Sequence, residues 1–403
     1  MSDIEQPRKQ KIVDINQVTP ENDNSNERSR FLVFFTAFFI SLLAGSLVLV
    51  YFLQQEPMAV LGVSAIANQQ TAGFDCDYAE AQKFEPFAGG ILKVSVDRVS
   101  YITLSEEEIY GFPISVQNPK CVVDNDFAVV YEQAGFFSFL LDRNGLVFQN
   151  QMKEPIYAAS ISNRGFVAYI TYREDTKGIV NLVDRAGVEF GRFESNESGF
   201  PIKAVFSPGG DVLSVVFINT DASTVHPMIK QFQIRSENGA YRLEQIAQYS
   251  PNLNSVLMQV SYSGNRRVFF SGVSDIFYLN EGLATEFRTP YTQIHSVHSN
   301  VDGLGVLYSQ GGEQNVQFSF LSNELVAGAS IVLGEKLIDS EIRGNRMLVA
   351  IDHMIYEIDM NGSRVLGSHE IGNSEILKIG FASSETIIVI TAGGVRVLPA
   401  FKS

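Results

Sequence analysis

Short, densely apolar runs recur about every forty residues along most of this chain, and this repeat constrains the fold more than any other feature. Their starts are separated by 35, 39, 46, 56, 35, 44 and 40 residues. Their short length and β-branched content favour strands over helices. Because they are continuously apolar rather than alternating, we expect both faces to be covered. The runs are Leu92–Val96, Phe127–Tyr131, Phe166–Ile170, Val212–Ile218, Val268–Phe270, Gly303–Tyr308, Met347–Ile351 and Ile387–Ile390.

Each run is framed by turns and followed by a more alternating run. A glycine turn such as Ser207-Pro208-Gly209-Gly210 precedes most of them, and an Asp-x-x-Gly turn such as Asp142-Arg143-Asn144-Gly145 ends the next strand. Glycine supplies the positive φ that tight hairpins need. Four antiparallel strands in about forty residues are typical of a propeller blade. We therefore predict an all-β fold, a seven- or eight-bladed β-propeller, over an array of sandwiches or a β-helix.

Two details of the predicted ring follow from the same pattern. The chain ends after Val395–Leu398, which reads as a third strand, so we expect a strand near Phe84–Phe87 to complete the last blade. The unit from Val212 to Val268 is about ten residues longer than the others. We place its surplus in Asn219–Pro227 or Gln248–Asn254, as protruding loops.

An uncharged apolar run, Phe31–Leu53, predicts one transmembrane helix before the propeller. Basic residues cluster before it and none follows until Lys83, which places the N-terminus in the cytoplasm and the C-terminal domain outside the cell. The expected organisation is a disordered cytoplasmic tail (1–30), the helix (31–53), a linker (54–75) and a propeller ectodomain (76–403). A cleaved signal peptide, with Ala65-Ile66-Ala67 as the cleavage site, is the competing interpretation.

Charge and cysteine content restrict the partners and the chemistry. The net charge of −15 disfavours nucleic acid and anionic lipid surfaces, and suits solubility or cationic partners. The two cysteines, Cys76 and Cys121, both fall in the predicted ectodomain. A disulfide between them would close a loop of about 45 residues and stabilise the fold by about 4 kcal/mol. Two separate buried thiols are the alternative.

No motif in the sequence carries catalytic chemistry. His295 and His298 would point to opposite faces of a strand, and Asp124-Asn125-Asp126 reads as a hairpin turn rather than a calcium loop. Serine-hydrolase, zinc-protease, phosphate-loop and dinucleotide motifs are absent. We therefore predict no catalytic, cofactor-binding or metal-binding residues and no cofactor. Which acidic residues converge in a central funnel is not readable from the linear sequence.

The order of a polar tail, one apolar span and then blades carrying Phe127–Tyr131, Lys177-Gly178-Ile179-Val180 and Phe206-Ser207-Pro208-Gly209-Gly210 resembles an uncharacterised family of single-pass membrane proteins with a β-propeller ectodomain. The resemblance implies a location in the envelope of clostridial-type Gram-positive bacteria. Its motifs are blade turns, so no functional residue is implied. The absence of tryptophan argues against sialidase-type, quinone-binding and Trp-Asp repeat propellers.

The leading functional hypothesis is a non-enzymatic binding or scaffolding module on the outer face of the cell membrane, with a protein or cell-wall partner on the propeller face. An envelope hydrolase or lyase acting on glycan or peptide is the alternative. It requires acidic or histidine residues converging at one end of the central channel. A transmembrane sensor that signals through the helix to residues 1–30 is a third hypothesis.

Overall fold

The computed structural model describes residues 72–76, 82–124, 126–197, 199–220, 225–253, 255–312 and 314–401, all within one compact unit, Leu61–Ser403. Every regular element in these residues is a β strand, and they contain no helix that could cross a membrane. The predicted tail, the predicted transmembrane helix Phe31–Leu53 and most of the predicted linker lie outside the described residues.

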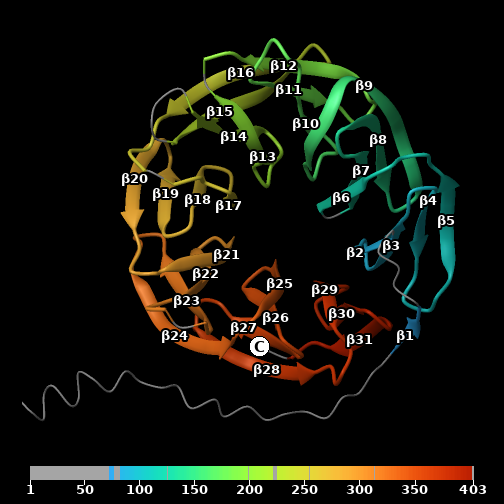
Figure 1. The fold of residues 1–403 in the computed structure, drawn as a ribbon, viewed down its shortest axis with the longest axis vertical. Coiled ribbons are helices and arrows are strands. Elements are labelled where there is room, and N and C mark those ends of the chain that lie inside the picture. The colour runs from blue at the N-terminus through green and yellow to red at the C-terminus, as the bar shows by residue number, and fades with distance from the viewer. Residues whose placement is uncertain are drawn as a thin grey trace, which may run out of the picture. The chain divides into compact units, whose positions relative to one another are not determined.

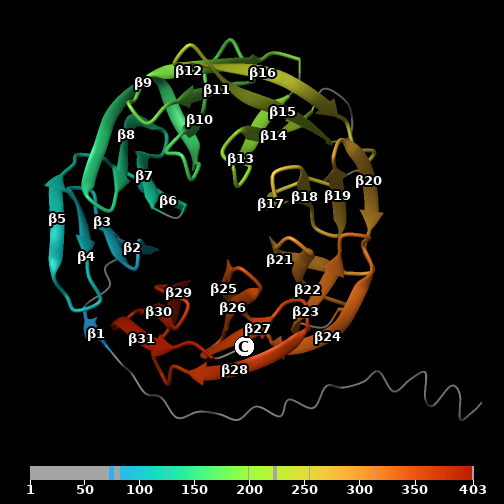
Figure 2. The same ribbon diagram turned by 180° about the vertical axis from the view of Figure 1, so that it is seen from behind.

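The strands form antiparallel sheets that follow one another around a common centre (Figures 1 and 2). In most of these sheets, strands that follow one another in the chain are also neighbours in the sheet. Such a sheet is a meander that runs from an innermost to an outermost strand. The first four-stranded sheet contains β2 (Lys83–Phe87), β3 (Gly90–Val94), β4 (Arg98–Ile102) and β5 (Glu108–Pro113).

One sheet has seven strands, because the 17-residue strand β9 serves two neighbouring meanders. Its first half pairs with β8, and its second half pairs with β10. The strands of this sheet are β6 (Pro119–Asp124), β7 (Phe127–Glu132), β8 (Gly135–Asp142), β9 (Gly145–Ile161), β10 (Val167–Thr171), β11 (Gly178–Val183) and β12 (Glu189–Ser195).

Four further four-stranded sheets complete most of the circle. They contain β13 (Phe200–Phe206), β14 (Val212–Asn219), β15 (His226–Glu237) and β16 (Ala240–Tyr249); β17 (Gln259–Ser263), β18 (Arg267–Ser271), β19 (Asp275–Asn280) and β20 (Leu283–Arg288); β21 (Gln293–Ser299), β22 (Gly303–Ser309), β23 (Val316–Ser322) and β24 (Ala327–Gly334); and β25 (Leu337–Arg343), β26 (Arg346–Ile351), β27 (Met354–Asp359) and β28 (Arg364–Glu370).

The last sheet joins the two ends of the described chain. It orders β29 (Ile376–Phe381), β30 (Thr386–Thr391) and β31 (Gly394–Pro399) from the centre outwards, and β1 (Ala72–Asp75) adds the outermost strand. The prediction that Phe84–Phe87 closes the ring is wrong, since those residues form the innermost strand β2 of the next sheet. The closing strand instead comes from residues that the sequence analysis placed in the linker. Gly73 fits there at φ +121°, because a Cβ would lie 2.4 Å from the carbonyl oxygen of Val395.

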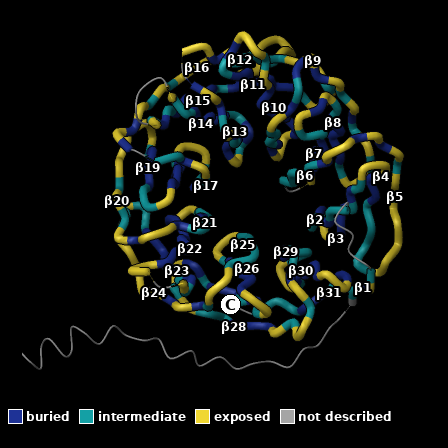
Figure 3. Tube along the Cα trace, in the orientation of Figure 1, coloured by how far each residue is buried: buried dark blue, intermediate teal, exposed yellow. Residues whose placement is uncertain are grey.

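The hydrophobic core lies between neighbouring sheets and is centred on the second strand of each meander. All eight predicted apolar runs overlap these second strands, which confirms that they form buried strands, although Val96 lies beyond the end of β3 and is exposed. All seven residues of β22 are buried, and β30 buries five of its six residues (Figure 3). Full burial of one such aliphatic side chain contributes about 1.5–3 kcal/mol. The second strands therefore supply much of the stability of the fold.

The long unit carries part of its surplus where the sequence predicted it, because the connection between β16 and β17 overlaps Gln248–Asn254. Residues 221–224 of the other predicted loop, Asn219–Pro227, lie outside the described residues. Part of the surplus lengthens β15 and β16, which have 12 and 10 residues. The segment between β16 and β17 is not simply a protruding loop, because Leu253 and Leu257 are buried in the hydrophobic cluster around β18. Two leucines in a polar stretch were too weak a signal to reveal this.

Candidate functional site

The innermost strand of each sheet pairs on one edge only, so its other edge needs partners for its backbone N–H groups. Between β25 and β29, carboxylates on the first strand meet this need. Asp339 Oδ2 accepts a hydrogen bond from the Ile379 amide at 3.0 Å, and Glu341 Oε1 accepts one from the Phe381 amide at 3.4 Å. The two acceptors, Asp339 and Glu341, are two residues apart on β25 because alternate residues share one side of a strand. The donors Ile379 and Phe381 have the same spacing on β29. We call β25 and β29 the charged strand pair.

Elsewhere in the ring, β17 and β21 make the same kind of contact with uncharged side chains. Gln259 Oε1 accepts from the Val297 amide at 2.9 Å, and the Gln259 Nε2 group donates to the His295 carbonyl at 2.9 Å. Ser261 Oγ accepts from the Ser299 amide at 2.8 Å. We call β17 and β21 the neutral strand pair.

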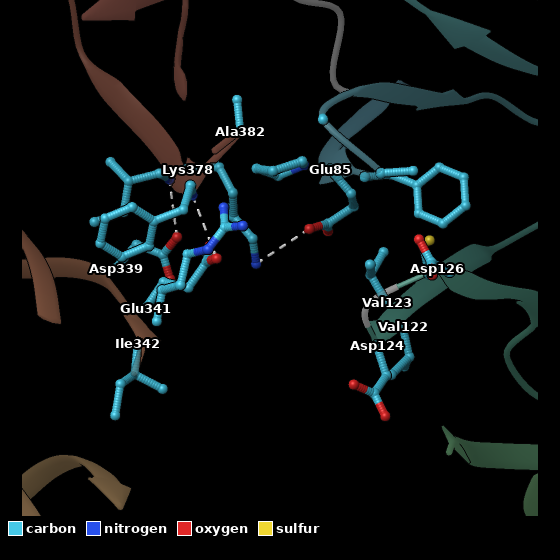
Figure 4. A pocket seen from close by; sticks show the side chains of 18 of the residues that line it. Glu85, Val122, Val123, Asp124, Asp126, Asp339, Glu341, Ile342, Lys378 and Ala382 are labelled. Carbon is cyan, nitrogen blue, oxygen red and sulfur yellow. Dashed lines mark hydrogen bonds and ion pairs between the residues drawn. The ribbon is translucent and has the colours of Figure 1, made fainter. Parts of the chain in front are cut away.

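A cavity of about 780 Å³ opens beside the charged strand pair. Its walls come from the innermost strands β25, β29, β2 and β6, from turns that follow them, and from Arg143 in the turn between β8 and β9 (Figure 4). Gly380 allows β29 to approach β2 here, since a Cβ at that position would lie 2.6 Å from Pro86 Cβ. The charged groups in the lining comprise five carboxylates and three cations: Glu85, Asp124, Asp126, Asp339 and Glu341, with Arg143, Arg343 and Lys378.

Lys378 is the central cation of this cavity. Its Nζ lies 3.4 Å from Glu85 Oε2, as the dashed line in Figure 4 shows. Burial alone would lower the pKa of Lys378, but the carboxylates of Glu85 and Asp339 outweigh burial and raise it. Lys378 therefore carries a positive charge and serves as the counter-ion of the surrounding carboxylates.

Burial destabilises the charged form of the carboxylates in this cavity. Burial raises the pKa of Glu85 in spite of Lys378, and burial also raises the pKa of Asp339. Burial raises the pKa of Glu341 to about 7, although the Phe381 amide favours the charged form. Buried carboxylates that lack enough positive charge can be stabilised by an added cation. The arrangement can therefore hold an ammonium or guanidinium group.

A second ion pair lies at the edge of the cavity, where Arg143 contacts Asp126. Both side chains are more than half exposed, so solvent screens their attraction and the pair adds little stability. Asp124 and Asp126 close the hairpin between β6 and β7, as the sequence analysis predicted for this turn.

The two histidines of interest lie on β21 but have separate partners. His298 Nε2 lies 2.8 Å from Ser340 Oγ, whereas His295 Nε2 lies 2.7 Å from Ser309 Oγ. Burial lowers the pKa of His298 to about 4 and also lowers the pKa of His295. No group of three histidine, cysteine or acidic side chains in the described residues is arranged to hold a metal ion.

Cys76 and Cys121 are both thiols in this structure, not joined by a disulfide. Cys76 follows β1 and packs beside the cluster around Phe74, while Cys121 lies in β6 and packs beside the cluster around Phe87. Burial raises the pKa of the Cys121 thiol, which disfavours the reactive thiolate. The disulfide stays a prediction about the oxidised protein.

Sequence reasoning did not single out Glu85, Asp339, Glu341 or Lys378. The usable signal was the segment Leu337–Arg343, which alternates two acidic residues with its neighbours on what is now an innermost strand. Its meaning depended on knowing that β29, four strands further along the chain, supplies Lys378 and that β2, near the start of the described residues, supplies Glu85.

Comparison with known structures supports a propeller-like fold. The chain is similar to the C-terminal WD40 domain of Sif2, with a TM-score of 0.59, 12% identity, and coverage of 83% of this chain and 99% of that one. It is also similar to BamB from Moraxella catarrhalis, with a TM-score of 0.52, 12% identity, and coverage of 82% and 100%. A eukaryotic initiation factor gives a TM-score of 0.52, 13% identity, and coverage of 84% and 89%.

At such identities these similarities concern the fold alone. No curated protein matches the sequence. The family comparison is more specific, because one family model matches residues 67–399, from just before β1 to the end of β31. The chain belongs to the DUF5711 family, a family of unknown function.

Proposed function

We propose that this protein is a non-catalytic binding module whose charged cavity holds a cationic group of a protein or cell-wall partner. One observation carries the proposal: Glu85, Asp339 and Glu341, together with Asp124 and Asp126, outnumber the three cations that line the same cavity. A lysine or arginine side chain of a partner would add the missing positive charge. Its hydrogen bonds to these carboxylates would be charge-assisted.

The walls of the cavity are suited to binding because they are already rigid. Asp339 and Glu341 are held by backbone amides of the next innermost strand, so little side-chain entropy remains to be lost when a ligand arrives. A volume of about 780 Å³ is within the range of ligand pockets and admits one or two side chains.

The blade count belongs to this proposal. Because β9 serves two meanders, the sheet order supports eight four-stranded blades, with β1 completing the eighth. Eight blades lie at the upper end of the sequence prediction and leave a wider centre than six or seven would.

The membrane location also belongs to the proposal. The uncharged span Phe31–Leu53 and the basic residues before it support a single-pass anchor with the propeller outside the cell. Such an anchor would raise the effective concentration of the module near membrane-bound or cell-wall partners.

An envelope hydrolase or lyase is a second candidate, favoured by one observation. Glu341, with a pKa of about 7, lies in the same cavity as Asp339, and a perturbed carboxyl group of this kind can act as a general acid. Both groups already accept backbone hydrogen bonds, which favours binding over catalysis. Turnover of a glycan or peptide substrate that Glu341→Gln abolishes would establish the enzyme.

The binding proposal is tested with the full-length protein in lipid nanodiscs and an amidated Lys-Gly repeat peptide, followed by calorimetric titration. We expect the Glu85→Gln/Asp339→Asn double variant to bind at least tenfold more weakly. Glu174→Gln/Glu189→Gln, which removes the same charge from exposed positions, is the matched control and should bind almost as well as the wild type. If both double variants bound the peptide equally weakly, the loss would come from net charge alone. That result would contradict a binding site in the cavity.

A further inference from the structure

A second pocket lies between two neighbouring meanders, where the second half of β9 and strands β10 and β11 meet the start of β13 (Figures 1 and 2). Its volume is about 400 Å³. Its lining includes Tyr157, Tyr172, Phe200 and Pro201, and we call it the aromatic pocket. No described residue lines both this pocket and the charged cavity, so the two sites are independent.

The three aromatic side chains of this pocket are exposed. Tyr157 is 46% exposed, and Tyr172 and Phe200 are each 39% exposed. The Tyr157 and Tyr172 rings meet edge to face, with centroids 6.1 Å apart and planes at 81° to each other. This is a favourable geometry for an aromatic pair, and the two rings form a nearly right-angled corner. Single exposed apolar side chains are common, but exposed rings gathered around one pocket indicate a binding surface.

The position of Tyr157 depends on a local irregularity of β9. Ile156 and Ala158 pair with consecutive residues of β10, so Tyr157 is the extra residue of a β-bulge. Four other innermost strands, β13, β21, β25 and β29, have the same irregularity at Ile202, His295, Ile338 and Leu377. The three aliphatic residues in this list pack against hydrophobic clusters. Bulges re-aim side chains, and the bulge of β9 directs a large ring to the surface instead.

The polar side-chain groups of the aromatic pocket are few, and they are able to donate hydrogen bonds. The Thr171 hydroxyl is buried and already accepts a hydrogen bond from Asn181 Nδ2 at 2.9 Å. The hydroxyls of Tyr157 and Tyr172 and the Lys177 ammonium are the other polar side-chain groups of the described lining. A phenol has one O–H donor, and an ammonium has three N–H donors and no acceptor. The pocket therefore combines apolar ring surfaces with donors for carbonyl oxygens.

A chain segment in the polyproline II conformation has the complementary groups. Its carbonyl oxygens lack internal hydrogen bonds, and proline has no backbone N–H that would need an acceptor. Such segments dock in aromatic-lined grooves at a low entropic cost, because their conformation is already formed. A sugar ring carries hydroxyls around its edge that need acceptors as well as donors, and the described lining residues include no carboxylate or amide side chain. The chemistry of the pocket therefore favours proline over a glycan.

We propose that the aromatic pocket binds a proline-rich segment of a partner protein in the polyproline II conformation. One proline ring packs into the corner between Tyr157 and Tyr172, and Phe200 contacts the neighbouring residues of the segment. The tyrosine hydroxyls and the Lys177 ammonium donate hydrogen bonds to its carbonyl oxygens. This second site lies on other strands than the charged cavity and goes beyond the proposed function.

The test uses the full-length protein and a fluorescein-labelled decaproline peptide, with binding followed by fluorescence anisotropy. A labelled glycine–serine peptide of the same length has neither proline rings nor a preformed conformation. We expect decaproline to bind at least about tenfold more tightly than this control peptide. Chitotetraose serves as the glycan competitor and should not displace decaproline.

Variants of the pocket locate the bound peptide. Tyr157→Ala and Tyr172→Ala should each weaken decaproline binding at least about tenfold, because either one removes a wall of the corner. Tyr172→Phe keeps the ring and removes a donor, so a loss of about threefold is expected. Phe136→Ala truncates an aromatic side chain of β8 that is 40% exposed and lies outside the lining, and it is the matched control. Urea unfolding verifies that each variant is folded.

A second readout does not depend on affinity. In protein labelled with 3-fluorotyrosine, the ¹⁹F resonance that disappears in Tyr172→Phe should shift on addition of decaproline and not on addition of the glycine–serine peptide. Glu85→Gln/Asp339→Asn should leave decaproline binding unchanged, which separates this site from the charged cavity. Failure of decaproline to bind, wild-type affinity in both tyrosine-to-alanine variants, equal loss in Phe136→Ala, or tighter binding of chitotetraose overturns the proposal.

Discussion

The charged and neutral strand pairs solve the same structural problem with different chemistry. In both, side chains two residues apart on one innermost strand accept hydrogen bonds from amides two residues apart on the next. Gln259 and Ser261 do this without charge, so the hydrogen bonds do not require carboxylates. Asp339 and Glu341 therefore bring charge that the fold itself does not need, and that charge lies in the cavity.

The comparison also indicates which of the two strand pairs contributes more to the stability of the folded protein. An uncharged acceptor loses little on burial once it is hydrogen-bonded, whereas a buried carboxylate opposes folding when it is charged. Because Glu341 has a higher pKa when folded than its ordinary value of 4.5, the folded state binds its proton more tightly. Its contribution is fully favourable below pH 4.5 and is lost as the pH rises through about 7.

The largest expected effect is on the neutral strand pair. Gln259→Leu removes the acceptor of the Val297 amide and the donor to the His295 carbonyl. Two backbone groups would lose their partners, which costs about 4 kcal/mol of unfolding free energy. Urea unfolding at pH 5 and pH 8 should show the same loss. A loss confined to one pH would contradict an uncharged, structural role.

The opposite sign is expected in the charged strand pair. Glu341→Gln keeps an acceptor for the Phe381 amide and removes the buried charge. We expect a gain in unfolding free energy of up to about 3 kcal/mol at pH 8 and no gain at pH 4, from a pKa raised from 4.5 to about 7. Urea unfolding across this pH range measures it. Destabilisation at pH 8 would show that the charge supports the fold.

A smaller effect is expected at the counter-ion. Lys378→Met leaves Glu85 and Asp339 without their nearest cation and should lower the unfolding free energy by about 2 kcal/mol at pH 8. Lys378 is 40% exposed, so solvent keeps the loss modest. The loss should shrink at pH 5, where the carboxylates begin to protonate. Thermal unfolding at both pH values, with Lys153→Gln as control, distinguishes this from a simple packing defect.

The smallest change in unfolding free energy is expected for Ser261 in the neutral strand pair. Ser261→Ala removes one acceptor from the Ser299 amide and should cost about 1 kcal/mol without altering peptide binding. Calorimetric titration with the Lys-Gly peptide and urea unfolding measure the two quantities on the same sample. Weaker peptide binding in this variant would show that the neutral strand pair, β17 and β21, forms part of the binding site.

The architecture could be predicted because its strongest signal is local. Runs such as Val212–Ile218 and Met347–Ile351 are apolar on both faces, and only a strand between two sheets buries both. The closing strand β1 escaped prediction because its four residues include one large apolar side chain, Phe74, and its partner β31 lies over 300 residues away.

The candidate site was beyond prediction for a related reason. Glu85 and Lys378 meet only because the first and last sheets are neighbours in the ring. Asp339 accepts from Ile379, forty residues further on, through the unpaired edge of a strand. Such contacts have no sequence period, whereas the buried runs do.

Hydrogen exchange of the full-length protein, with and without the Lys-Gly peptide, tests the central claim most directly. Protein and peptide are mixed under saturating conditions, and backbone exchange is followed by mass spectrometry. We predict slower exchange in β2, β25 and β29 and unchanged exchange in β17 and β21. Protection of β17 and β21, or of outer strands such as β5 and β20 alone, would contradict the assignment of binding to the charged side of the ring.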